Sequence, residues 1–73
     1  MAEKQLNQVQ SGENFSFVSI PSHIKSDLIR LGLCEGDLVK CISRIPGGPV
    51  VVEKDLVQIA IGNNYASEIS ISQ

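Results

Sequence analysis

The sequence lacks tryptophan and contains only two phenylalanines and one tyrosine. Aliphatic Val, Ile and Leu side chains must therefore fill most of its interior. With 73 residues the chain predicts one small domain. A domain of this size buries only about 60% of the surface that its unfolded chain exposes. We therefore expect a thin aliphatic core.

A surplus of basic residues is also missing. Lys and Arg together number 6 and Asp and Glu 8, so the formal net charge is −2. The basic residues are scattered singly along the chain. Proteins that bind nucleic acid neutralise its phosphates with clustered Lys and Arg. Nucleic acid is therefore not among the partners that the sequence predicts.

Long apolar runs are absent as well. None approaches the roughly 20 residues that a membrane span requires. The first twelve residues lack the apolar stretch of a signal peptide. We therefore expect a cytoplasmic protein with no membrane insertion. Cys34 and Cys41 fit that compartment as free thiols, and their spacing matches neither a redox pair nor a zinc knuckle.

The most strongly patterned stretch, residues 24–52, begins with a helix. Ile24, Leu28 and Leu31 recur at helical spacing, and this stripe predicts a helix over residues 23–31 that faces a core. Ser22 is the predicted N-cap. Gly32 stands where a left-handed residue ends a helix, with Leu33 as the apolar contact of that cap.

Period-two alternation predicts short strands around this helix. They cover residues 15–20, 38–45, 50–53, 56–61 and 69–72, and residues 65–68 predict one helical turn. Five short strands and one helix indicate a mainly β fold, a small closed or nearly closed barrel. We expect residues 1–5 to be a flexible terminus and residues 6–73 to form the single domain.

The alternation also predicts which side chains face the core. Phe15 and Phe17 lie on the opposite strand face from Val18 and Ile20; they either pack under another element or stand at the surface, and we favour burial. Cys41 is predicted to be a small core residue, and Val57 to point inward with Ile59 and Ile61. The predicted core comprises Val18, Ile20, Ile24, Leu28, Leu31, Val39, Ile59 and Ile69.

No arrangement of residues in the sequence indicates catalysis. The single histidine, His23, has no neighbouring nucleophile in the sequence, so an enzyme is not predicted. Residues 46–49, Pro-Gly-Gly-Pro, resemble a phosphate-binding loop only in their glycines and are better explained as a hairpin loop. His23 and Cys34 are weak candidate metal ligands, and a tetrahedral zinc site with Cys41 would lack a fourth ligand. We therefore predict no tightly bound metal.

The order and spacing of several motifs resemble the FeoA family of small SH3-like proteins. The resemblance covers most of the chain and rests on Gly12-Glu13, Val18-Ser19-Ile20, Leu31-Gly32-Leu33, Gly36, Pro46-Gly47-Gly48-Pro49, Val57-Gln58-Ile59-Ala60-Ile61, Ala66 and Ile69. The chain departs from the family pattern in three places. Its Pro-Gly loop is one residue shorter, Gly62 replaces a common arginine, and Phe15 and Phe17 replace polar residues.

The resemblance implies an SH3-like barrel with an accessory role in ferrous iron transport. In that role it would bind the cytoplasmic GTPase region of the membrane permease FeoB, and association with iron is part of the same implication. The contact surface that we predict combines the outer side and exit of the helix with the Pro-Gly loop: Ile29, Arg30, Leu33, Glu35, Gly47 and Gly48. The alternative is a regulatory domain like the SH3-like C-terminal domain of iron-dependent transcriptional repressors.

Overall fold

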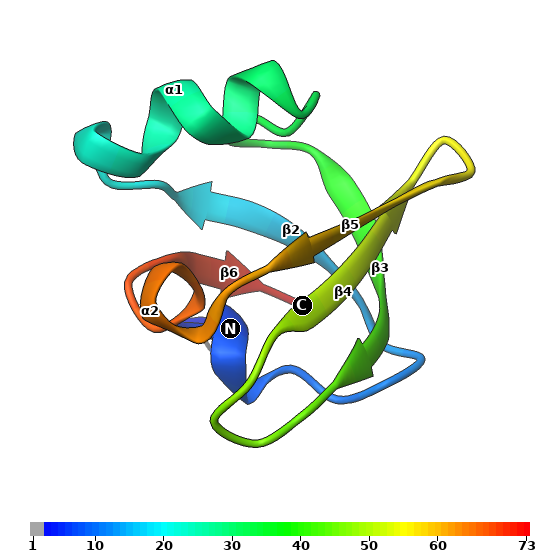
Figure 1. Ribbon diagram of the computed structural model, residues 1–73. Helices are drawn as coiled ribbons and strands as arrows, with labels where there is room; N and C mark the ends of the chain where they lie inside the picture. The colour runs from blue at the N-terminus through cyan, green and yellow to red at the C-terminus, as the bar shows by residue number, and fades with distance from the viewer. Residues whose placement is uncertain (1–2) are drawn as a thin grey trace.

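The computed structural model describes residues 3–73, which form one antiparallel sheet with helices between its strands (Figure 1). In chain order the elements are β1 (Glu3–Gln5), η1 (Leu6–Gln8, a 3-10 helix), β2 (Asn14–Ser19), α1 (Ser22–Arg30), β3 (Leu38–Arg44), β4 (Val50–Lys54), β5 (Val57–Ile61), α2 (Asn63–Ala66) and β6 (Ser70–Ser72). The strand order in the sheet is β1-β6-β2-β3-β4-β5.

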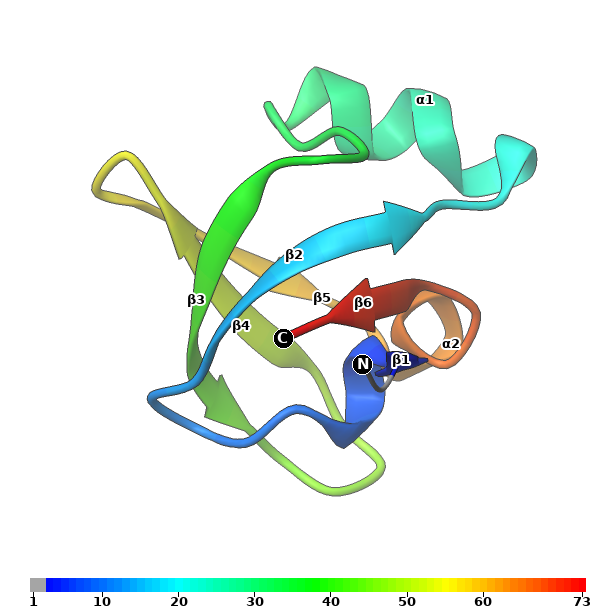
Figure 2. The ribbon, with the colours of Figure 1, turned by 180° about the vertical axis from the view of Figure 1, so that it is seen from behind.

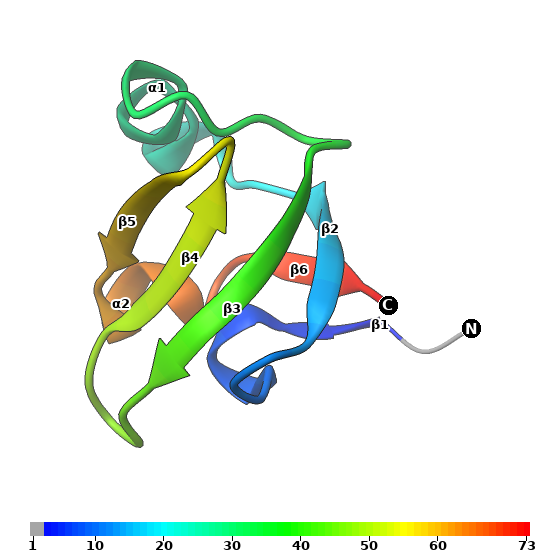
Figure 3. The same ribbon diagram turned by 90° about the vertical axis from the view of Figure 1, so that its right-hand side faces the viewer.

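The sheet curls around a single core, as the views from behind and from the side show (Figures 2 and 3). α1 connects β2 to β3 and covers one end of the curled sheet, whereas α2 connects β5 to β6. The predicted class, a small mainly β SH3-like barrel with an inserted helix, is confirmed. The described residues form six strands where we expected five, and the predicted helical turn lies slightly earlier, at Asn63–Ala66.

The additional strand is β1, in a segment that we expected to be flexible. Glu3, Lys4 and Gln5 pair with Ser72, Ile71 and Ser70 of β6. The expectation of a flexible terminus is therefore wrong for residues 3–5, and residues 1–2 lie outside the described part of the chain. No periodicity marks this polar segment as a strand, because its pairing depends on backbone hydrogen bonds to the distant end of the chain.

Aliphatic side chains from the helices and from β3, β4, β5 and β6 fill the core, together with both phenylalanines of β2. Phe15 and Phe17 are buried, and their rings meet edge to face with centroids 5.6 Å apart. The favoured prediction for these two residues is confirmed. The buried set is Leu6, Val9, Phe15, Phe17, Ile20, Ile24, Leu28, Leu33, Val39, Cys41, Val50, Val52, Ile61, Ala66, Ile69 and Ile71, with Ile59 partly buried against it.

Two irregularities in strand pairing explain errors in the predicted faces. The register of β2 against β6 shifts between Phe17 and Ser19, so Phe17 and Ile20 both face inward although they are three residues apart. Val18 is therefore 38% exposed, and its assignment to the core is wrong. A similar shift in β3, between Cys41 and Ser43, ends the inward alternation of Val39 and Cys41, and Ile45 beyond it is exposed.

Both ends of α1 differ in detail from the prediction. The helix begins at Ser22, and Pro21 is its N-cap, with the Pro21 carbonyl accepting hydrogen bonds from the amides of Ile24 and Lys25. The Ser22 side chain is therefore not the cap. At the other end Leu31 is 51% exposed, so its assignment to the core is also wrong. None of the helices formed by residues 3–73 has the length and apolar character to cross a bilayer.

Candidate functional site

The end of α1 is fixed by a left-handed glycine, as the sequence predicted. Gly32 has φ +91°, and its amide bonds the carbonyl of Ile29, while the amide of Leu33 bonds the carbonyl of Leu28 at 2.9 Å. These two bonds form the Schellman motif, whose apolar contact pairs the residue after the glycine with the last helical turn. Leu33 therefore occupies the core position beneath α1, and Leu31 stands outside.

Leu33 was expected both as the cap contact and as a partner contact. It is fully buried, so it serves as the cap contact and cannot belong to a contact surface. The same cap exposes Leu31, which the sequence had assigned to the core. Leu33 therefore lies in the interior and Leu31 at the surface, the reverse of the two predictions.

Residues 31–37, which we call the helix-exit loop, are tied to the tip of the β4–β5 hairpin by Lys54. Its ammonium donates hydrogen bonds to the Gly32 carbonyl and to Asp37 Oδ2, both at 2.8 Å. Asp37 Oδ2 also accepts the amide of Cys34 at 2.8 Å. The hydrogen bond from Lys54, and then that from the Cys34 amide, lower the pKa of Asp37. The same pairing raises the pKa of Lys54.

A second carboxylate fixes the helix-exit loop to the end of β2. Glu35 Oε2 accepts the amide of Ile20 at 2.9 Å and lies 3.6 Å from the ammonium of Lys25. The hydrogen bond from Ile20 is the main reason that the pKa of Glu35 lies below its ordinary value. Glu35, one of the predicted contact residues, thus has a structural partner on each side.

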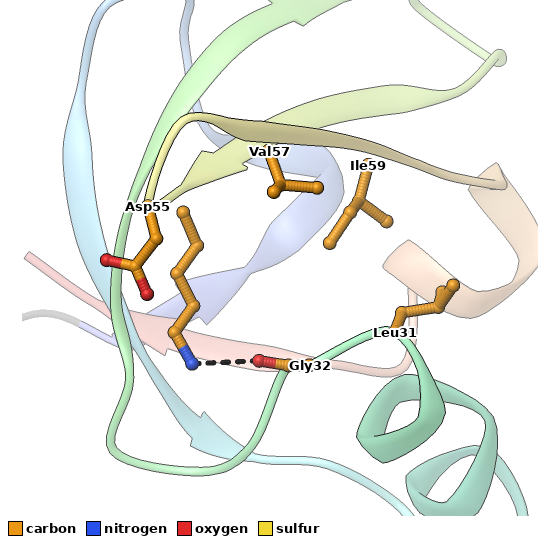
Figure 4. A pocket seen from close by; sticks show the side chains of 6 residues that line it. Leu31, Gly32, Asp55, Val57 and Ile59 are labelled. Atoms are coloured by element: carbon orange, nitrogen blue, oxygen red, sulfur yellow. Dashed lines mark hydrogen bonds between the residues drawn. The ribbon is translucent and has the colours of Figure 1, made fainter.

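An open groove of about 250 Å³ lies between the end of α1 and β5 (Figure 4). Its lining consists of Leu31, Gly32, Lys54, Asp55, Val57 and Ile59. Val57 and Ile59 project from β5 toward Leu31 (Figure 4). The ammonium of Lys54, which also lines the groove, donates to the Gly32 carbonyl. The groove is apolar along its walls, with its charged residues at the hairpin end.

Large apolar side chains continue from the groove onto the surface. Val57 is 56% exposed, and Leu56, beside it at the hairpin tip, is 91% exposed. Ile29 and Leu31 are exposed at the end of α1. We call these four residues the helix-exit patch. Val57 was predicted to face the core, together with Ile61. It lies on the same face of β5 as Ile61, but near the hairpin tip this face is no longer covered, so Val57 is exposed.

The predicted contact residues do not form one surface. Ile29 and Arg30 lie at the exposed end of α1, and Arg30 Nη1 lies 3.8 Å from Asp27 Oδ1. Gly47 and Gly48 lie in the β3–β4 loop, at the opposite end of the sheet from α1 (Figure 1). The hairpin tip, Asp55 and Leu56, takes their place beside the helix exit. The sequence contains a signal for this hairpin tip, an apolar Leu56 next to a turn aspartate. The prediction assigns Leu56 to the strand over residues 56–61 instead.

The two weak metal candidates are also separated. His23 lies in the first turn of α1, with Nε2 3.1 Å from Glu68 Oε1, whereas Cys34 is exposed in the helix-exit loop. Seven helical residues, about 10 Å of helix, and the first part of the helix-exit loop stand between them. Across residues 3–73 no cluster of three or more His, Cys, Asp or Glu side chains has the geometry to hold a metal.

The fold and the groove together define a class: a small SH3-like β domain that presents an apolar groove beside an inserted helix. A family model identifies the class more closely, because the FeoA domain model matches residues 4–73. The chain belongs to the FeoA domain family. Membership of this family supports a role in ferrous iron transport. Comparison with curated protein sequences gives no match.

Solved structures of FeoA proteins share the fold. A crystal structure of an iron uptake regulatory protein, FeoA, superposes with a TM-score of 0.87 at 22% identity, covering 99% of this chain and 97% of that one. A solution structure of FeoA from Chlorobium tepidum gives 0.80 at 22% identity, over 93% of this chain and 68% of the other. A FeoA-like protein from Clostridium acetobutylicum gives 0.81 at 16% identity, over 99% and 87%.

Proposed function

We propose that this protein is a cytoplasmic accessory protein of ferrous iron transport that acts by binding the GTPase region of a FeoB-type permease. It carries out no chemistry of its own. The observation that carries this proposal is the helix-exit patch of a FeoA-family domain, where Leu56, Val57, Leu31 and Ile29 are exposed beside an open groove. Contiguous exposed apolar side chains with polar neighbours are typical of protein-interaction sites.

The charged groups around the groove support a binding role over a catalytic one. Lys54 is occupied by Gly32 and Asp37, and Glu35 by Ile20 and Lys25. These pairs hold the helix-exit loop in place and leave the apolar side chains beside them exposed. Fixed apolar side chains of this kind are suited to packing against a partner.

The proposed contact surface consists of the helix-exit patch and Arg30. The Arg30 side chain is largely exposed and only loosely paired with Asp27, so it is free to reorient toward an acidic group of the partner. Arginine is enriched among residues that dominate binding energy. A contact of this size belongs with small, transient interfaces. We therefore expect a dissociation constant in the micromolar range, which corresponds to a binding free energy of about −8 kcal/mol.

The test is a titration of the permease's cytoplasmic region with the wild type and with Arg30→Glu, in the GDP-bound and GTP-bound states. We expect the variant to bind at least about tenfold more weakly, while its stability changes by less than about 0.5 kcal/mol because the side chain is exposed. Lys40→Glu is the matched control, since it makes the same charge change at an exposed position of β3.

Equal losses in the two variants would indicate general charge attraction and contradict the proposed contact. Absence of binding by the wild type in every nucleotide state would contradict the transport mechanism itself. The regulatory-domain alternative would then become the better explanation of an SH3-like domain with this surface.

A further inference from the structure

β5 is an edge strand, because it has only one neighbour, β4, in the sheet. Figure 3 shows it at the outer side of the sheet beside β4. Its five residues carry no charge and no proline, and their pairing with β4 has no register shift. Natural edge strands are usually protected from strand addition by charges, prolines, bulges or shortness. The other edge, β1, has three residues and carries Glu3 and Lys4. β5 has none of these protections.

The turn geometry identifies which backbone groups of β5 face outward. Asp55 and Leu56 form a two-residue turn, with φ values of 52° and 68°, between the paired residues Lys54 and Val57. Positive φ at both positions defines the type I′ hairpin, in which the closing pair is hydrogen-bonded. Hydrogen-bonded and non-bonded pairs then alternate along the strands. Gln58 and Ala60 therefore direct their amides and carbonyls away from β4.

The two residues that carry these outward groups lie at the surface. Gln58 and Ala60 are both exposed, and within residues 3–73 neither makes a backbone hydrogen bond to an element outside its own hairpin. The apolar groove lies along the same strand, lined by the intervening side chains Val57 and Ile59. A free edge next to a groove for alternate side chains is the arrangement by which sheets bind extended peptides.

Leu56 gives an independent indication. Its φ of 68° lies in the left-handed region, which disfavours side chains larger than those of Gly, Asn or Asp. Its side chain makes little contact with the rest of the protein, being 91% exposed. Folding therefore gains nothing from a leucine at this position. Strain held at an exposed apolar residue indicates a contact outside the chain.

We propose that β5 is a docking strand: an extended apolar segment of a partner pairs with Gln58 and Ala60, places alternate side chains in the groove, and contacts Leu56. This inference rests on the proposed function, since it names the kind of segment that the permease would supply. Asp55, which forms no ion pair with any residue of 3–73, favours a basic residue at the end of that segment.

Surface area favours a segment over a second copy of this chain. A stable interface takes about 800 Å² from each partner, which is about a fifth of the 4196 Å² surface of this protein. A strand of five residues is about 17 Å long. Its edge and one groove match the length of a short extended segment, whereas a stable interface with a second copy would have to extend over about a fifth of the surface.

Hydrogen exchange at single amides tests the pairing directly. In the free protein the amides of Gln58 and Ala60 should exchange rapidly, and those of Val57 and Ile59 slowly. On addition of the permease's cytoplasmic region we expect at least about tenfold slower exchange at Gln58 and Ala60, because their amides enter a ladder. Protection of these amides in the free protein that rises with its concentration would overturn the proposal in favour of a second copy.

Two variants test the edge and the hairpin tip. Ala60→Pro removes an outward amide without removing a bond to β4, and Ala60→Ser is its matched control because it keeps that amide. We expect Ala60→Pro to bind at least about tenfold more weakly than Ala60→Ser. Leu56→Asn keeps a residue that accepts positive φ; it should bind more weakly while melting at the same temperature or higher.

The outcomes separate this inference from the proposed function. Binding with unprotected Gln58 and Ala60 amides, and equal affinities for Ala60→Pro and Ala60→Ser, would overturn the docking strand and leave the permease as partner. Absence of binding by the wild type would overturn both. Circular dichroism of Ala60→Pro, compared with that of Ala60→Ser, separates loss of binding from loss of fold.

Discussion

Leu28 attaches α1 both to the core and to the cap that ends the helix. It is buried, it is the helical residue of the Schellman cap that pairs with Leu33, and its carbonyl accepts the amides of Leu31 and Leu33. Its side chain therefore serves both the core and the cap. In a domain with so thin a core, one such residue is a large share of the total stability.

Leu28→Ala is expected to destabilise the protein by about 2–5 kcal/mol, through lost burial and the cavity that remains. Ile29→Ala, at the next position and exposed, is the matched control and should cost less than about 0.5 kcal/mol. Urea unfolding followed by circular dichroism measures both. A loss below about 0.5 kcal/mol for Leu28→Ala would contradict the packing of α1 described here.

The two cysteines should differ sharply in reactivity. Cys41 is buried, and burial raises the pKa of its thiol, whereas Cys34 is exposed in the helix-exit loop. A thiol reagent under native conditions should modify one site per chain rapidly, and denaturant should expose the second. Cys34→Ser should remove the rapid phase; its persistence would show that Cys41 is accessible.

At the scale of residues, the sequence predicted most core positions but not their exceptions. Phe15, Phe17, Ile24 and Leu28 follow from regular helical or strand periodicity. Val18 is an exception: it was grouped with Ile20, but the register shift after Phe17 turns Ile20 inward and leaves Val18 on the outer face. No local feature of the sequence marks that shift, since it depends on pairing with β6.

At the scale of elements, the helix-exit loop and the β4–β5 hairpin act as one unit. Lys54 joins them through Gly32 and Asp37, so the groove is held open between two elements that are fixed relative to one another. The hydrogen-bonded pair also makes the joint sensitive to pH. The ionised carboxylate of Asp37 stabilises the joint through Lys54, and this stabilisation is lost when the carboxylate is protonated.

Asp37→Asn should lower the melting temperature at neutral pH, and the gap from the wild type should narrow in acid. Because the pKa of Asp37 is lowered in the folded state, its stabilisation is fully present above the pKa of an unfolded Asp, about 4, and is lost as pH falls through the folded value. Melting temperatures of both proteins from pH 7 down to pH 3 measure the gap.

Asp55→Asn is the matched control for this titration, because it removes a neighbouring exposed carboxylate that forms no ion pair with the described residues. It should leave the melting temperature nearly unchanged at pH 7. A gap for Asp37→Asn that stays constant down to pH 3 would show that the carboxylate does not stabilise the joint.

Elements were predicted better than the site that they form. The left-handed stop at Gly32 and the hairpin loop at residues 46–49 follow from local turn chemistry. The turn at Asp55 and Leu56 does not, because leucine is not a residue that two-residue turns prefer. The groove was therefore not predicted, because its β5 wall follows a turn that the residue types do not indicate.

At the scale of the whole molecule, the fold separates two surfaces that the sequence had combined. The helix-exit patch lies at one end of the sheet and the Pro-Gly loop at the other (Figure 1). The class of fold could be predicted because its motifs follow one another at characteristic distances along the chain. Spatial grouping could not, since it depends on how the sheet curls, which brings Leu31 and Gly32 beside the β4–β5 hairpin.

The positions of the candidate metal ligands indicate that a metal ion does not stabilise the fold. The candidate ligands His23 and Cys34 lie at opposite ends of α1, and Cys41 is buried among apolar side chains. Since the sheet, the cap and the loop joints are complete without a coordinated ion, chelator treatment should leave the melting temperature unchanged. A structural zinc site, by contrast, supplies folding free energy that a chelator removes. Thermal unfolding before and after chelation, with metal analysis of the purified protein, tests this. A stoichiometric metal that survives purification, and that is lost together with the fold in Cys34→Ser, would contradict the prediction.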